Sequence, residues 1–187
     1  MLGPRETPRL WERHLLNCAG VSDLVEDGQV VVDLGSGAGL PGLVLAIQRP
    51  EVQVVLVEPL LRRATFLTEA VSALGLRNTL VRRSRAEDLH GSLLVDVVTA
   101  RAVAPVDRLA GWALPLLHPG GRLLALKGSK AEEEVEQAGA ALRRLGARSW
   151  SVVPVGSEDL GTAGRVVVVE AGTAPAAPAA QRKKGRR

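Results

Sequence analysis

The sequence predicts an α/β fold with a mostly parallel sheet of seven strands. Short runs of β-branched residues alternate with segments in which apolar residues recur every three or four positions. Apolar strands separated by amphipathic helices are typical of a parallel sheet that helices cover on both faces. Glycines gather at 35–42, directly after the first such run, where doubly wound folds bind their ligands. Together these observations predict a Rossmann-like architecture.

Five apolar runs are expected to form the parallel strands: 29–34, 52–57, 78–82, 95–100 and 122–127. A stripe at helical spacing follows the second run and should pack on the sheet. Its residues are Leu61, Ala64, Leu67, Val71 and Leu74. Two later runs, 149–155 and 165–170, have only a loop between them, so we expect them to pair antiparallel and to form the antiparallel edge of the sheet.

The chain is expected to divide into three parts. Residues 1–25 predict a helical lead-in, and residues 26–171 contain the seven strands of one α/β domain. Residues 172–187 are an Ala/Pro linker and a basic tail, a composition typical of disorder.

The net charge of +4 is concentrated in the tail, because five positive charges lie in the last six residues. Arg182, Lys183 and Lys184 belong to this group, which suits attraction to polyphosphate or serves only as a solubilising terminus. The chain has neither a signal-like start nor a bilayer-length apolar run, so we expect a cytoplasmic protein without a membrane partner. Its single cysteine, Cys18, predicts core packing and no metal site.

The glycine loop predicts a site for a nucleotide-like cofactor. Gly35, Gly37 and Gly39 permit positive φ and allow backbone N–H groups to face a ligand, and a helix should begin near Leu40. The alternative is a turn that only packs a helix on a strand. Because Gly37, Gly39 and Gly42 also satisfy the dinucleotide pattern G-x-G-x-x-G, the glycines alone do not identify the cofactor.

Acidic residues favour S-adenosylmethionine over NAD. Asp33 at the end of the first strand would repel a pyrophosphate but attract the sulfonium and ammonium groups of S-adenosylmethionine. Glu58, which ends the second strand, can accept hydrogen bonds from ribose hydroxyls, unless it is simply solvated. Ala86 and Glu87 follow the third strand, where an adenine ring would lie. This combination favours a methyltransferase over a dehydrogenase.

Six segments in order resemble the RsmG (GidB) family of bacterial ribosomal RNA methyltransferases. They are WERHLLNC, VVDLGSGAGLPGLVLAI, EPLLRRATFL, SRAED, DVVTARAVAP and LLALKG, and they lie within roughly residues 10–130. The resemblance implies a class I S-adenosylmethionine-dependent fold and methylation of guanine N7 in the 530 loop of 16S rRNA. It implies cofactor contacts at Gly35, Leu40, Glu58, Pro59, Leu60, Ala86, Glu87 and Arg101. The family often has phenylalanine where Leu40 stands, which puts a stacking role there in doubt.

The expected reaction requires no catalytic base, because guanine N7 has a free lone pair and no proton to lose. Catalysis would then consist of alignment and desolvation. The stretch TARAVAP lacks both the [DN]-P-P-[YF] motif of amine methylation and a Pro-Cys pair. Arg101 is expected to hold the cofactor carboxylate or a target phosphate, or else to form a salt bridge with Asp33 or Asp96.

Few aromatic residues are available to stack on RNA bases. Phe66, Trp112 and Trp150 are expected in the core and Trp11 at the surface. Candidate RNA contacts, each of which has a merely solvated or capping alternative, are Arg13, His14, Lys127, Lys130 and the basic tail, together with Arg62, Arg63, Arg82, Arg83 and Arg85. The expected partner of a monomer is 16S rRNA or the 30S subunit. Two alternatives are a NAD-dependent oxidoreductase and a noncatalytic ribosome-binding module.

Overall fold

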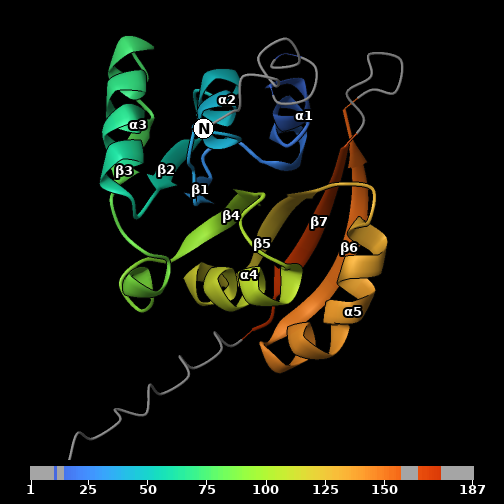
Figure 1. Cartoon of the computed structure of the whole chain (residues 1–187). Helices are drawn as coiled ribbons and strands as arrows, with labels where there is room; N and C mark the ends of the chain where they lie inside the picture. The colour runs from blue at the N-terminus through green and yellow to red at the C-terminus, as the bar shows by residue number, and fades with distance from the viewer. Residues whose placement is uncertain (1–10, 12–14, 157–163, 174–187) are drawn as a thin grey trace, which may run out of the picture.

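The computed structural model describes residues 11, 15–156 and 164–173. Its seven strands form one sheet in the order β3-β2-β1-β4-β5-β7-β6 (Figure 1). The strands are β1 (Val30–Leu34), β2 (Gln53–Val57), β3 (Thr79–Arg82), β4 (Val95–Arg101), β5 (Leu117–Lys127), β6 (Ala147–Val155) and β7 (Gly164–Ala171). The predicted strands are therefore confirmed. The strand order changes direction between β1 and β4, and in such folds ligands bind outside the carboxyl ends of the strands at this point.

One strand runs against the others. β1 to β5 are parallel, and β7 pairs antiparallel with both β5 and β6. The antiparallel pairing of the last two strands is confirmed, but β7 lies second from the edge and β6 forms the edge itself. After β5 the chain crosses over through a helix, and β6 does not pair with β5 but lies one strand position further out. β7 then fills the position between β5 and β6.

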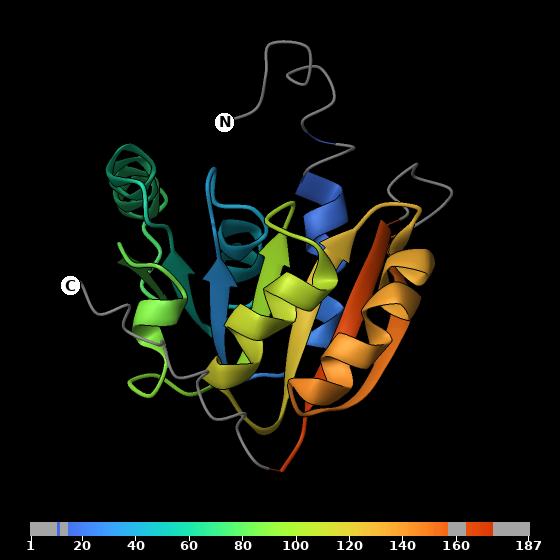
Figure 2. The ribbon, with the colours of Figure 1, turned by 60° about the horizontal axis from the view of Figure 1, so that its bottom comes forward.

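Helices cover both faces of the sheet (Figure 2). One layer contains α1 (Leu16–Ala19), α2 (Gly42–Gln48) and α3 (Leu61–Ala73), and the other contains α4 (Val106–Ala113) and α5 (Ala131–Arg144). Three short 3-10 helices, η3 (Ser22–Leu24), η4 (Glu87–Leu89) and η5 (Leu114–Leu116), complete the connections.

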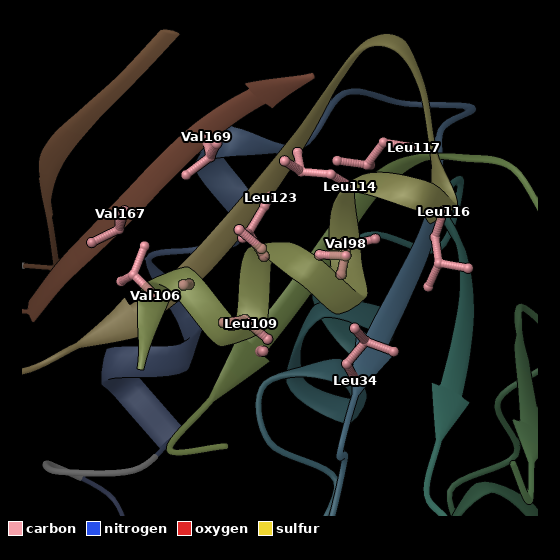
Figure 3. Packing of buried hydrophobic residues seen from close by; sticks show 14 of the residues in the cluster. Leu34, Val98, Val106, Leu109, Leu114, Leu116, Leu117, Leu123, Val167 and Val169 are labelled. Atoms are coloured by element: carbon pink, nitrogen blue, oxygen red, sulfur yellow. The ribbon is translucent and has the colours of Figure 1, made fainter. Parts of the chain in front are cut away.

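The larger core lies between the sheet and the layer of α4 and α5. Helix α4 places Val106, Leu109, Ala110 and Ala113 on one buried face, the spacing that an amphipathic helix requires. Figure 3 shows Val106 and Leu109 against Val98 and other strand residues. The acidic first turn and basic last turn of α5 complement its helix dipole.

The second core lies under α1, α2 and α3 and includes Cys18, which is fully buried as expected. The stripe predicted for α3 is correct at its centre, because Ala64 and Leu67 are buried. It is wrong at its ends, because Leu61 and Leu74 are 60% and 52% exposed. A helix of 13 residues that leans on an edge strand extends past the sheet at both ends.

The described part of the lead-in packs on the same core, since Val21 and Val25 are buried there beside Cys18. The rest of residues 1–14 apart from Trp11, and nearly all of the linker and tail, lie outside the described residues. Trp11 is exposed, as expected. Within the described ranges no helix has both the length and the apolar character needed to cross a membrane.

Candidate functional site: the cavity beside the glycine loop

The glycine loop is fixed to the end of the neighbouring strand. The N–H groups of Gly35 and Ser36 both donate to the carbonyl of Val57, at 2.8 and 3.1 Å. Gly35, Gly37 and Gly39 all have positive φ, as predicted. Helix α2 begins at Gly42, two residues later than expected, because a residue before proline, here Leu40, disfavours helical backbone.

Asp33 lies beneath the loop and is completely buried. Its Oδ2 accepts a hydrogen bond from the N–H of Gly42 at 3.1 Å. A Cβ on Gly42 would lie only 2.7 Å from this oxygen, so the glycine is required for the close approach. Asp33 Oδ1 has no hydrogen-bond partner among the described residues. Burial raises the pKa of the Asp33 carboxyl to about 7, against the lowering effect of the Gly42 and Ser36 bonds and the Arg101 charge.

Glu58 is buried at the end of β2 and holds two backbone groups. Its Oε2 accepts from the N–H of Gly37 at 3.0 Å, and its Oε1 accepts from the N–H of Leu60 at 3.0 Å. The Arg63 guanidinium lies 3.8 Å from Oε2. Glu58 therefore joins the glycine loop to the start of α3, a structural contact that the sequence did not indicate.

A cavity of about 280 Å³ opens at the carboxyl ends of β1, β2 and β3. Four predicted cofactor residues line it: Gly35, Pro59, Ala86 and Glu87. Ligand cavities typically measure about 300–1,000 Å³. At about 280 Å³ this cavity lies just below that range, so it suits only a part of the cofactor of about nucleoside size, such as its adenosine end.

The other predicted cofactor residues surround the cavity without lining it. Gly37, Gly39 and Leu40 continue the loop, and Leu40 is half-buried against the α2 core rather than stacked on a ligand surface. Leu60 is 54% exposed. Asp33 and Glu58 lie behind the loop, as described above.

Sequence reasoning missed the wall that α4 contributes. Trp112 and Arg108 line the cavity, with the Arg108 guanidinium 4.9 Å from the centroid of the indole ring. Trp112 was expected in the core and is only half-buried. Arg108 and Trp112 are four residues apart on one helix, and this spacing in the sequence could have indicated that the two side chains meet. Val103 also lines the cavity, and a Cβ on Gly35 would lie 3.0 Å from it.

Arg101 lies at the end of β4, half-buried, and donates from Nη1 to Cys18 Sγ at 3.3 Å. Burial raises the pKa of the Cys18 thiol, and the nearby Arg101 charge opposes that rise. The alternative pairing with Asp96 is wrong, because Asp96 is five residues upstream on the same strand, about 16 Å away, and accepts from the N–H of Val30.

The two predicted lysines differ. Lys127 donates from Nζ to Glu134 at 2.7 Å and to the carbonyl of Ala104 at 2.8 Å, so it fixes the loop after β4, which argues against a role in binding phosphate. Lys130 is exposed at the start of α5. Arg13, His14, Arg182, Lys183 and Lys184 lie outside the described residues. Within the described ranges no group of three or more His, Cys, Asp or Glu side chains could hold a metal ion.

Sheet order, glycine loop and cavity define a Rossmann-like fold of the methyltransferase class, and solved structures agree. A S-adenosylmethionine-dependent methyltransferase from Aquifex aeolicus superposes with a TM-score of 0.63 at 20% identity, covering 91% of this chain and 99% of that one. TYW2 from M. jannaschii, solved in complex with AdoMet, gives 0.64 at 18% identity over 91% of this chain and 76% of its own.

The family model described as "rRNA small subunit methyltransferase G" (GidB) matches residues 1–160, so the chain belongs to this family. A Streptomyces coelicolor protein named "Ribosomal RNA small subunit methyltransferase G" is 56% identical over 176 residues, which is 94% of this chain and 74% of that protein. A Thermobifida fusca protein of the same name is 52% identical over 199 residues, covering all of this chain and 84% of its own length.

Proposed function

We propose that this protein uses S-adenosylmethionine to methylate ribosomal RNA of the small subunit, at guanine N7 in the 530 loop of 16S rRNA. The observation that carries the proposal is the cavity lined by Gly35, Pro59, Ala86 and Glu87, four residues that the family resemblance had implied as cofactor contacts. Family membership supports RNA of the small subunit as the substrate.

The residues present fit the cofactor. Asp33 is buried behind the glycine loop and accepts from the N–H of Gly42, so it would hold the loop in place against the cofactor. Trp112 offers an aromatic wall for an adenine ring, and the Glu87 side chain, which also lines the cavity, can accept hydrogen bonds from hydroxyl or amino donors. When bound, S-adenosylmethionine supplies a methyl group made electrophilic by its sulfonium.

The chain's own residues then align the nucleophile and exclude water. The loop after β4, Ala102 to Pro105, contains no side chain that could act as a general base, which agrees with a nucleophile that has no proton to lose. Ala102 in this loop has φ of 53°, and Val103 lies against Gly35. The loop therefore turns back over the glycine loop, where a target base must enter.

Arg101 is proposed to orient a charged group of the cofactor or of the RNA, because its guanidinium stands at this edge beside buried Asp33. Lys130, Arg13, His14 and the basic tail with Arg182, Lys183 and Lys184 are proposed to contact RNA phosphate. The partner would be 16S rRNA or the 30S subunit, met by a monomer in the cytoplasm.

The test is methyl transfer with a mapped product. The full chain is incubated with methyl-labelled S-adenosylmethionine and small subunits that lack the modification, and the labelled nucleotide is located by nuclease digestion and mass spectrometry. We expect one 7-methylguanine in the 530 loop. Label on another nucleotide would correct the target, whereas subunit binding without any transfer would favour a noncatalytic module.

A further inference from the structure

A second, larger hollow lies on the other side of the glycine loop from the cofactor cavity. It measures about 740 Å³ and is formed by the loop and the outward side of α3. We call it the α3 groove, lined by Gly37, Ala38, Leu61, Arg62, Arg63, Thr65, Phe66 and Glu69. Figure 1 shows that α3 lies at the outer end of its helix layer.

The apolar part of the groove is at the surface. Phe66, the only phenylalanine in the chain, is 49% exposed, although the sequence had suggested a core position. Leu61 is 60% exposed. An aromatic ring and a neighbouring leucine held open to solvent in one concave surface indicate a binding partner.

The charged part of the groove indicates what that partner is. Arg62 and Arg63 stand on its rim, and Glu69 is the only acidic residue that lines it. Arg63 lies 3.8 Å from the buried Glu58, whereas Arg62 is exposed and has no ion pair within the described ranges. An aromatic face beside arginines is the arrangement by which proteins hold unpaired nucleotides, with the ring under the base and the guanidinium on phosphate.

The groove is also in the right place. Gly37 and Ala38 form its inner wall, and Gly37 is bound by Glu58 at the point where the glycine loop meets α3. Because Gly35 of the same loop lines the cofactor cavity, a nucleotide in the groove would be separated from that cavity only by the glycine loop.

We propose that the α3 groove receives an unpaired base next to the target guanine, stacked on Phe66, with its phosphate at Arg62. This inference rests on the proposed function, because it names the surface that holds the RNA substrate of that reaction. It also identifies an exposed aromatic residue that takes over the stacking role for which the sequence had offered only arginines.

The test compares Phe66 variants for equilibrium binding of unmodified 16S rRNA and for methyl transfer to small subunits. Phe66→Trp should bind RNA within about twofold of the wild type, because its ring still stacks. Phe66→Leu and Phe66→Ala should bind about tenfold more weakly, since a base on an aromatic ring contributes that much or more. Leu74→Ala, which is also exposed but lies directly after the end of α3 and outside the groove, should bind like the wild type.

Salt dependence tests the arginine separately. Arg62→Ala should lower the slope of log affinity against log salt by about 0.7, the value for one phosphate of a single strand. The control is Arg144→Ala, an exposed arginine on α5 in the opposite helix layer, which should leave the slope unchanged.

The outcomes separate the two proposals. If the wild type transfers methyl groups while Phe66→Leu binds RNA as well as Phe66→Trp, stacking is refuted and the proposed function survives. If Phe66→Ala instead weakens S-adenosylmethionine binding in calorimetry, the groove belongs to the cofactor site. A wild type that neither binds nor methylates RNA would overturn the proposed function itself.

Discussion

Replacing Asp33 by asparagine should make the protein more stable at alkaline pH and less able to bind its cofactor. The Asp33 carboxyl is fully buried with a pKa of about 7, against an ordinary value of 3.8. Between these two values the folded chain holds a proton that the unfolded chain has released. Stability is therefore lost as the pH rises through this window, by about 1.4 kcal/mol per pH unit.

The magnitude follows from the window. From pH 5 to pH 8 the wild type should lose about 3 kcal/mol of unfolding free energy through this one group, and nothing further above pH 7. Asp33→Asn does not titrate, so its stability relative to the wild type should rise by about 3 kcal/mol over the same interval. A buried amide N–H in place of Oδ1 costs about 1–3 kcal/mol at every pH, so it lowers the stability of the variant equally at pH 5 and at pH 8.

Urea unfolding followed by circular dichroism at pH 5 and pH 8 measures this difference. Thr79→Val is the control, because Thr79 is also a buried polar residue of the sheet but has no titratable group; its difference from the wild type should stay constant. S-adenosylmethionine should bind to Asp33→Asn up to about tenfold more weakly, since an amide oxygen accepts from the Gly42 N–H less strongly than a carboxylate oxygen and the glycine loop is held less firmly. A stability difference that is flat between the two pH values would refute the reasoning.

Three further perturbations test the site. Gly39→Ala should destabilise the fold by more than Gly28→Ala. Both glycines have positive φ, but an added Cβ at Gly39 would lie 2.2 Å from a leucine of α2, whereas at Gly28 it would meet nothing. Thermal melts of the two variants measure the difference. Trp112→Ala should weaken cofactor binding about tenfold, whereas Trp150→Ala, also half-buried but on β6, should leave it unchanged. Isothermal titration measures both affinities, and equal losses would argue against a role of Trp112 in binding the cofactor. Glu58→Gln should raise the rate of amide hydrogen exchange in the glycine loop, because one amide oxygen cannot accept from the Gly37 and Leu60 N–H groups in the same geometry. An unchanged exchange rate would show that Glu58 does not hold the loop to the start of α3.

The sheet could be read from the sequence because central parallel strands are continuous apolar runs with turn residues between them. Most strand bounds were right to within one or two residues, but β5 begins at Leu117 rather than 122. The segment His118 to Gly121 has the composition of a turn and lies in a register shift: Leu117 pairs with Val95 and Arg122 with Val97, so the strand extends back across these residues only through the pairing of Leu117 with β4. Such pairing is a tertiary effect that no local pattern contains.

The site was predictable where it depends on the backbone next to a strand end. Gly35, Pro59, Ala86 and Glu87 follow three successive strands, so their meeting at one edge follows from the fold class. Side-chain environment was not predictable in the same way. Phe66 is apolar but faces outward, because the buried face of α3 is set by Ala64 and Leu67, and Trp112 reaches the cavity only through the packing of α4.

The central claim is that the cavity beside the glycine loop holds a cationic methyl donor and not a dinucleotide. Isothermal titration of the full chain with S-adenosylmethionine, S-adenosylhomocysteine and NAD tests it most directly. We predict one-site binding of the first two compounds and no heat with NAD. Binding of NAD with no affinity for either S-adenosyl compound would contradict it.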